Sequence, residues 1–319
     1  MSPQNEILSF THKIKNLFKE EGFFKTGVSK IEELSEEKKY FRKWLEENRN
    51  ADMAWLELSI EKRTNPKLIN EEFISIISAA YIYETPYRHF ENPGTGKISR
   101  YAWGSADYHK ILKKKLKKIC KDIEELDGGV KTKYYVDDGP VMDKVWAVKS
   151  GIGWMGKNTN VIDPESGSYF FICDILINRE LEFDKPINDL CESCNICLNA
   201  CPTGALYEPY KLDANLCISY HTIENKNEIP DYINLNGWIF GCDICQEVCP
   251  FNKGSLFTEE KSFYPIERIY NKSLDELEKI NKEEFNELFK SSPVKRTKYS
   301  GWKRNIEKAK KEMREENLK

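Results

Sequence analysis

The stretches CESCNICLNACP at positions 191–202 and CDICQEVCP at positions 242–250 hold most of the chain's ten cysteines. The first has the C-x2-C-x2-C-x3-C-P spacing that binds an iron–sulfur cluster in bacterial ferredoxins. Three cysteines at three-residue steps can hold one cluster, and the fourth, before a proline, reaches the other cluster in two-cluster proteins. The spacing therefore predicts two [4Fe–4S] clusters and, with them, one-electron chemistry.

The second stretch has three cysteines, so its cluster needs one more ligand. Cys217 lies between the two stretches and is the natural supplement. The sequence then predicts two sets of four ligands, Cys191, Cys194, Cys197 and Cys249 in the first set and Cys201, Cys217, Cys242 and Cys245 in the second. We expect the two remaining cysteines, Cys120 and Cys173, to be packed thiols.

Length and composition indicate a large domain with a smaller one. The chain has 319 residues, of which 40% are hydrophobic, enough to bury a sizeable core. Disulfides are the competing explanation of the cysteines, but the metal-ligand spacing and the lack of a signal-like segment argue against them. No apolar run approaches the roughly 20 residues that span a bilayer. We expect a cytoplasmic, reduced protein without a membrane partner.

Two basic stretches interrupt a chain whose net charge is −3. KILKKKLKKICK covers 110–121, and KRTKYSGWKRNIEKAKK covers 295–311, where Tyr299 and Trp302 lie among the cations. Cations with aromatic rings suit phosphate contact and base stacking, whereas cations alone are typical of a solvated helix face. The pattern favours the solvated face for the first stretch and leaves both possibilities open for the second.

Periodicity predicts a three-part organisation. Helices are expected at 4–21, 36–48, 107–126 and 141–150, and strands at 73–83, 131–136, 160–162 and 169–177. Strands that alternate with helices make residues 1–180 an α/β (α+β) domain. A two-cluster ferredoxin-like domain covers 181–255, and a helical C-terminal segment covers 256–319.

Two further features between the expected elements could carry chemistry. Asp137 and Asp138 end the strand at 131–136, where a carboxylate could act as a general acid or simply cap the next helix. The glycine-rich loop GIGWMGKN at 151–158 could cradle a phosphate, but it matches neither a Walker nor a dinucleotide motif.

Taken together, motifs along most of the chain resemble those of the epoxyqueuosine reductases. The similarity covers about residues 5–306 and includes both cysteine stretches. Its other motifs are KRTNP at 62–66, YAWGSADYHKILKKKL at 101–116, VDDGPVMDKVWAVKSGIGWMGKN at 136–158, GSYFFICDIL at 167–176, LDANLCISYHTIE at 212–224 and FKSSPVKRTKYSGWKRN at 289–305.

The resemblance implies a cobalamin-dependent oxidoreductase of queuosine biosynthesis. Its substrate would be epoxyqueuosine at the wobble position of tRNA, reduced to queuosine. A low-potential electron donor would pass electrons through the two clusters to give cob(I)alamin, and a carboxyl group would supply a proton. Asp137 matches the family's catalytic carboxylate, whereas Asp138 falls where the family often has a small hydroxylated residue, so it is held as the alternative.

The resemblance also implies binding residues. Arg63, Tyr101, Asp137, Lys157 and Asn158 would border cobalamin. Lys144 stands where the family usually has an arginine. It keeps the positive charge but lacks the planar guanidinium group that can make two parallel hydrogen bonds. The chain would be a short form without the family's C-terminal HEAT-like repeats and would act as a monomer. We therefore expect tRNA phosphates to bind the C-terminal cations Lys295, Arg296, Lys298, Lys303 and Arg304.

Two alternatives remain. A reductive dehalogenase also joins cobalamin to two [4Fe–4S] clusters, but it typically carries a twin-arginine export signal. A plain two-cluster electron-transfer protein would explain the cysteines but not the motifs in residues 62–158.

Overall fold

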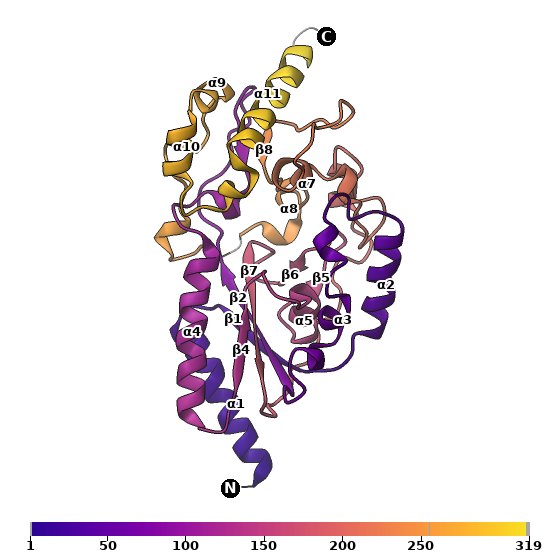
Figure 1. The fold of residues 1–319 in the computed structure, drawn as a ribbon. Helices are drawn as coiled ribbons and strands as arrows, with labels where there is room; N and C mark the ends of the chain where they lie inside the picture. The colour runs from indigo at the N-terminus through magenta and orange to yellow at the C-terminus, as the bar shows by residue number, and fades with distance from the viewer. Residues whose placement is uncertain (1, 255, 317–319) are drawn as a thin grey trace.

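A four-stranded antiparallel sheet organises the N-terminal half of the molecule (Figure 1). This computed structural model describes residues 2–254 and 256–316. The strands run in the order β1-β2-β7-β4, with bounds Lys25–Lys30, Ser75–Ile82, Phe170–Ile177 and Thr132–Tyr135. The predicted fold class is confirmed, and the sheet is of the antiparallel, α+β kind.

Helices cover both faces of this sheet. α1 (Pro3–Glu20) and α4 (Tyr108–Leu126) pack on one face and α5 (Asp143–Lys149) on the other (Figure 1). Every residue of β2 is buried because apolar side chains leave it in both directions, Ile77 toward α1 and α4 and Ile76 toward α5. The prediction of a buried strand from the apolar run at 73–83 is confirmed.

Local sequence explains where the two long helices begin. Ser2 caps α1 by accepting a hydrogen bond from Asn5 N, and Pro3 occupies the first turn, where its missing N–H costs nothing. Asp107 caps α4 by accepting from His109 N. The apolar residues of α4 recur at helical spacing and are buried against the sheet, as the sequence predicts.

The C-terminal half is built from short elements around a second core. Its elements are α6 (Ile196–Ala200), α7 (Ile218–Ile223), β8 (Trp238–Phe240), α8 (Ile244–Glu247), α9 (Leu274–Glu278), α10 (Lys282–Leu288) and α11 (Lys298–Glu316). The remaining elements are α2 (Ser35–Glu46), α3 (Ile60–Thr64), β3 (Lys97–Ile98), β5 (Trp154–Met155) and β6 (Val161–Ile162).

β3 connects the two halves. It pairs in parallel with β8, and Ile98 and Trp103 pack in one core with Phe240 and Trp302. Residues of the predicted 1–180 segment thus contribute to the C-terminal core. The bounds of the three predicted segments stay a prediction, and residues 1, 255 and 317–319 within them lie outside the described part.

Other local predictions have clear outcomes. Cys120 and Cys173 are buried, as expected for packed thiols. The loop predicted at 151–158 contains a short strand, because β5 pairs with β6. In residues 2–254 and 256–316, none of the helices has the length and hydropathy needed to cross a membrane.

Candidate functional site

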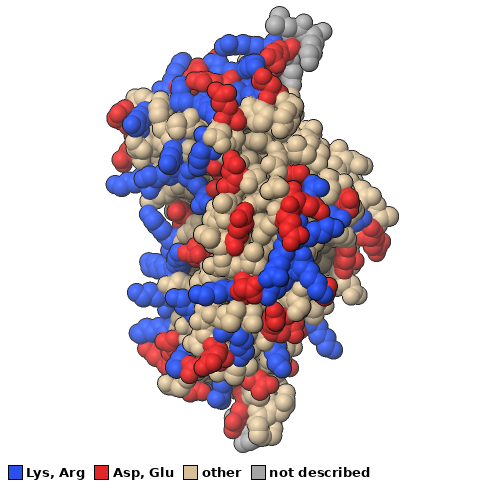
Figure 2. Space-filling model, turned by 45° about the vertical axis from the view of Figure 1, so that its right-hand side comes forward, with Lys and Arg blue, Asp and Glu red and all other residues tan. Residues whose placement is uncertain are grey.

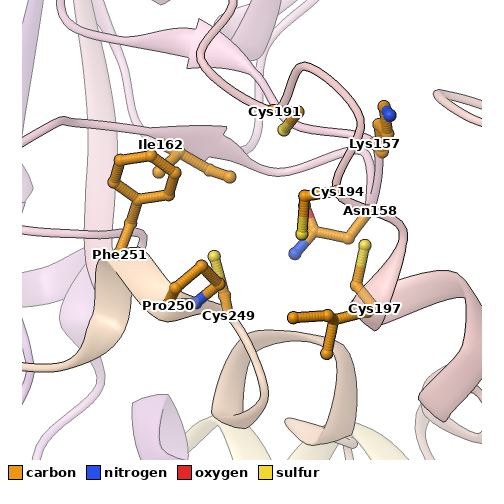
Figure 3. Close-up of a pocket in the computed structure, with 10 residues that line it drawn as sticks. Lys157, Asn158, Ile162, Cys191, Cys194, Cys197, Cys249, Pro250 and Phe251 are labelled. Carbon is orange, nitrogen blue, oxygen red and sulfur yellow. The ribbon is translucent and has the colours of Figure 1, made fainter.

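The first predicted set of cysteines lines one pocket (Figure 3). Cys191, Cys194 and Cys197 come from the first cysteine stretch and Cys249 from the second, and their sulfur atoms point into the same space. The other lining residues are Lys157, Asn158, Ile162, Ile196, Pro250 and Phe251. The apolar lining and the four convergent sulfurs suit a cluster, whose potential depends on how far water is excluded.

Backbone contacts shape the first stretch around this pocket. Cys194 N donates to Cys191 O at 2.8 Å, which closes a turn, and Glu192 within that turn has a left-handed φ of 42°. Lys157 Nζ donates to Glu192 O at 2.6 Å and to Asn195 Oδ1 at 3.0 Å. Trp154 Nε1 lies 3.4 Å from Cys191 Sγ, as expected of a hydrogen bond that tunes a ligand thiolate.

The second predicted set also comes together. Cys217 is close enough to Cys201 to interact electrostatically, and Cys245 interacts with both. Cys242 interacts with Cys217 and Cys245. Cys217 therefore lies near the other three cysteines of the predicted set, although it belongs to neither cysteine stretch, and its role as the fourth ligand stays a prediction.

Burial disfavours the ionised form of several of these thiols. In the described part of the chain, no three Cys, His, Asp or Glu side chains lie close enough to hold one metal ion. Burial raises the pKa of Cys197 to about 11, and burial also raises the pKa values of Cys217 and Cys249. Because the ligands are thiolates, cluster assembly must displace protons from these thiols.

Asp137 lies just after β4, in a bend of the backbone. Its φ is 52°, a left-handed value that Asp tolerates better than most residues. The side chain is exposed, and its Oδ2 accepts a hydrogen bond from Tyr108 Oη at 2.8 Å. Tyr108 begins α4, so the helix that packs on the sheet also fixes the direction of this carboxylate.

Asp138 has different partners. It forms an ion pair with Lys113 of α4, and its Oδ1 accepts from Val136 N at 3.2 Å. Burial opposes ionisation here, but these two hydrogen bonds outweigh it and hold the pKa of Asp138 below its usual value. An ionised, paired carboxylate is a poor proton donor, which favours Asp137 over its neighbour.

Four charged or phenolic side chains from distant segments lie near Asp137; together with it we call them the Asp137 site. Arg63, Tyr101, Lys144 and Arg296 each lie close enough to Asp137 to interact electrostatically. Lys144 also interacts with Cys217 and Cys245 of the second set. The second set therefore adjoins the Asp137 site.

Part of the Asp137 site fits a large polar cofactor. Arg63 Nε is buried and has no hydrogen-bond partner within residues 2–254 and 256–316, and Arg63 Nη1 reaches Gly139 O only at 3.4 Å. An unsatisfied buried donor is costly, so a ligand oxygen at this position would stabilise it. Tyr101, whose pKa is raised by burial and by Asp137, is a second hydrogen-bond donor there.

Lys157 and Asn158 lie against the cysteine stretches in this structure. Lys157 holds the turn at Glu192, and Asn158 Nδ2 donates to Cys245 O at 3.2 Å. Their loop reaches the Asp137 site at its other end, because Lys144 Nζ donates to Thr159 O at 2.9 Å. Their contact with cobalamin stays a prediction.

The C-terminal cations predicted to bind tRNA divide into two groups. Lys295, Arg296 and Lys298 are exposed, and Arg296 pairs with Glu224. Lys303 Nζ donates to Glu278 O at 3.1 Å. Arg304 donates to backbone carbonyls of 221–227, so its guanidinium is used to hold α7 and the loop after it.

The structure excludes one of the two possibilities that the sequence leaves open for Trp302. This ring is not available for base stacking, because it is fully buried and packs against Phe285 and Phe289. Its basic neighbours Lys303 and Arg304 donate to backbone carbonyls of the protein.

Sequence reasoning missed two parts of the site. Tyr108 lies within a quoted motif, yet its hydrogen bond to Asp137 depends on packing across 29 residues of chain. Asp143 and the fully buried Asp174 form a hydrogen-bonded pair behind the Asp137 site. The signal for that pair was a lone aspartate within the apolar run FFICDILI of β7.

Comparison with known families supports the same assignment. Residues 190–252 match the family model described as a 4Fe–4S double cluster binding domain. Residues 63–138 match the model described as "Epoxyqueuosine reductase QueG, DUF1730". The first match covers both cysteine stretches, and the second runs from Arg63 to Asp138.

Individual relatives agree over nearly the whole chain. An epoxyqueuosine reductase of Cellulophaga algicola is 42% identical over 288 residues, which is 90% of this chain and 93% of that one. A crystal structure of epoxyqueuosine reductase with a tRNA-Tyr epoxyqueuosine-modified stem loop superposes with a TM-score of 0.85 at 32% identity, covering 96% of this chain and 82% of that one.

A third relative concerns the aspartate loop. Epoxyqueuosine reductase from Bacillus subtilis, solved with its catalytic aspartate loop swung out of the active site, matches with a TM-score of 0.87 at 29% identity, covering 97% of this chain and 83% of that one. Sequence, fold and cysteine pattern lead to one conclusion: the chain belongs to the epoxyqueuosine reductase family.

Proposed function

We propose that this protein reduces epoxyqueuosine in tRNA to queuosine. One observation carries the proposal: Lys144 interacts electrostatically both with Asp137 and with Cys217 and Cys245 of the second cysteine set. A candidate proton donor and a candidate electron source therefore lie near the same lysine. Removing an epoxide oxygen as water, with formation of an alkene, consumes two electrons and two protons.

Cobalamin, supplied with electrons through the two clusters, would provide the low-potential electron pair for this reduction. Arg63 and Tyr101 would donate hydrogen bonds to it. Lys144, with a compact charge instead of a guanidinium fork, would make a single contact where an arginine could make two. Lys157 and Asn158 would border cobalamin, because Lys144 donates a hydrogen bond to Thr159 of their loop.

Asp137 would act on the substrate itself. Its carboxyl group is exposed to solvent and is oriented by Tyr108, so it can approach the epoxide oxygen and protonate the developing alkoxide. The ionised Asp138, held by Lys113, would stay outside the reaction.

The two cysteine sets would divide the electron path. Cys201, Cys217, Cys242 and Cys245 would hold the cluster nearest the Asp137 site. Cys191, Cys194, Cys197 and Cys249 would hold the cluster that receives electrons from a low-potential donor. That the protein acts as a cytoplasmic monomer, and that a low-potential electron donor serves it, stay predictions.

The test is direct reduction of a defined RNA. Anaerobically purified, cluster-loaded protein is incubated with cobalamin, a low-potential chemical reductant and an anticodon stem–loop that carries epoxyqueuosine. Mass spectrometry of the nucleosides should show loss of one oxygen atom, and omission of cobalamin should abolish the change. An unaltered nucleoside, with both clusters and cobalamin bound to the protein, would refute the proposal.

A further inference from the structure

α4 and β4 form a shallow groove lined by lysines. Among the described residues that line this groove, one is acidic, Glu124. The lysines of the groove are Lys114, Lys117, Lys118, Lys121 and Lys133. In the described part of the chain, no ion pair involves Lys114, Lys117 or Lys133, so their charges face solvent. Figure 2 shows basic side chains in a column along the left-hand edge, at the height of α4.

The lysines of α4 repel one another. Residues 108–121 contain seven lysines and no acidic residue. Lys110, Lys114, Lys117 and Lys121 follow one another at steps of four, three and four, so they form a single stripe on one face of the helix. Like charges at these spacings destabilise a helix by about 0.2–0.5 kcal/mol per pair. A merely solvated face would be more stable with mixed charges.

This stripe begins at the Asp137 site. Tyr108 hydrogen-bonds Asp137, and Lys110 Nζ donates to Ser291 Oγ at 3.2 Å, in the loop before the exposed Lys295 and Lys298. From Lys110 to Lys121 the stripe runs eleven residues, or about 16 Å along the helix axis. It therefore leads outward from the place where the modified base would react.

We propose that the groove between α4 and β4 is a phosphate-binding track for the stem of the substrate RNA. This inference rests on the proposed function, because it takes the anticodon loop to be seated at the Asp137 site. The stem must then leave the protein along one side. The charge stripe offers a row of cations at the right place, whereas Arg304 and Lys303 of the C-terminal stretch are engaged with the protein itself.

An acidic electron-donor protein is the competing partner for a basic surface. Such a donor must approach the first cysteine set, whose pocket adjoins Ile162 of β6. β5 and β6 contact α5, which lies on the opposite face of the sheet from α4 (Figure 1). The α4 groove is therefore on the wrong side for electron entry, and RNA is the better occupant.

The experiment compares two double variants in cluster-loaded protein. Lys114→Ala/Lys117→Ala removes two charges of the track, and the helix should persist because alanine is the best helix former. Lys39→Ala/Lys43→Ala removes two exposed charges from α2, on the other side of the molecule (Figure 1). Binding of the epoxyqueuosine stem–loop is measured across a salt series, and turnover is measured at saturating stem–loop with a chemical reductant.

We expect the track variant to shallow the slope of log affinity against log salt by about 1.4–1.8, that is about 0.7–0.9 for each phosphate that the protein no longer neutralises. Between about 50 and 200 mM salt, the affinity advantage of the wild type should then shrink by about tenfold. The α2 variant should match the wild type. Saturating turnover should be unchanged in both variants, because neither pair touches the reacting atoms.

Several outcomes separate the alternatives. An unchanged slope and affinity in the track variant would overturn the RNA track. Unchanged RNA binding with slower turnover, seen only when an acidic protein donor replaces the chemical reductant, would also overturn it and assign the groove to that donor. If the wild type binds but does not reduce the stem–loop, the proposed function fails, while the comparison of salt slopes still decides the track.

Discussion

At the scale of single residues, Asp137 and Asp138 show how adjacent carboxylates acquire different roles. Tyr108 orients Asp137, whereas Lys113 neutralises Asp138. We expect Asp137→Asn to keep both clusters and to reduce the epoxide about 10²–10⁴ times more slowly, because an amide cannot deliver a proton. Asp138→Asn is the matched control and should stay near the wild-type rate. Single-turnover assays measure both, and the reverse ranking would show that the proton comes from Asp138.

The carboxyl pair behind the Asp137 site should give the protein an unusual pH dependence. Burial raises the pKa of Asp174 from 3.8 to about 6, and it hydrogen-bonds Asp143 and Ser78. A carboxyl whose pKa is raised by folding stabilises the protein below about pH 3.8, and that contribution is lost as the pH rises through about 6.

Between acidic and neutral pH the wild type should therefore lose roughly 1–3 kcal/mol of its free energy of unfolding. Asp174→Asn should not show this loss. The amide cannot ionise but can still hydrogen-bond both neighbours. Urea unfolding of wild type and variant across this pH range tests the expectation, and parallel curves would contradict it.

The role of a single residue was predictable where the sequence pattern indicated which residues it contacts. The spacing of Cys191, Cys194 and Cys197 indicated that they lie together, and the structure places them with Cys249 in one pocket. Cys217 was assigned because the second stretch has one cysteine too few, and its role as a ligand stays a prediction. Arg304 and Trp302 could not be placed, because their partners are carbonyls and rings from other segments.

At the scale of elements, Cys217 lies where a short 3-10 turn ends and α7 begins, well separated from both cysteine stretches. Cys217→Ser should lose the cluster beside the Asp137 site and keep the other, so iron should fall from about eight to about four atoms per chain. Cys120→Ser, at a buried thiol of α4, is the control and should keep both clusters. Iron analysis with EPR spectroscopy would reveal two intact clusters in Cys217→Ser if the ligand assignment is wrong.

β1 and α5 approach so closely that their packing depends on a glycine. A Cβ atom on Gly27 would lie 1.8 Å from Ser150 O, at the end of α5. Gly27→Ala should therefore destabilise the protein by about 1–3 kcal/mol through overpacking. Gly128→Ala is the control, because its Cβ would meet no atom within 4 Å. Thermal unfolding of the two variants should differ clearly, and equal melting temperatures would show that α5 can shift without cost.

Elements with a strong period were predictable and short or polar ones were not. α1 and α4 were predictable from apolar residues at helical spacing, and β2 was predictable from a continuous apolar run. β1, with sequence KTGVSK, exposes its last lysine and buries only three residues, so it lacks that signal. β3 and β8 are two and three residues long, too short to show any period.

At the scale of the whole molecule, Arg100 joins the sheet to the second cysteine stretch. Its Nη2 donates to Glu247 Oε1 at 3.0 Å, and its guanidinium lies within 4.0 Å of both Glu84 and Asp243. Arg100→Ala would leave the buried Asp243 without its ion-pair partner, whereas Glu84 keeps Arg88 and Glu247 keeps His89, so the change should cost about 3 kcal/mol.

Arg100→Lys keeps the charge but not the bidentate fork, and it should lie between alanine and the wild type. Because Asp243 lies between two cysteines of the second set, that cluster should also be lost more readily in Arg100→Ala. Chemical unfolding and iron retention measure the two effects, and wild-type behaviour in both would show that the carboxylates are solvated locally.

The overall arrangement was only partly predictable from the sequence. The order of the motifs indicated the family. It also indicated an α/β part followed by a cysteine-rich part. The return of residues 97–103 into the C-terminal core was not predictable, because a two-residue strand pairs with a partner about 140 residues later.

That pairing of β3 with β8 has a consequence for synthesis on the ribosome. Ile98 and Trp103 share a core with Ile306, so about 200 further residues must be translated before their packing is complete. At about 5–20 residues per second, this takes roughly 10–40 s. Throughout that interval the nascent chain exposes apolar side chains in its first third. The segment around Ile98 and Trp103 therefore completes its packing only after the C-terminal half emerges, and chaperone binding to this segment would protect it until then.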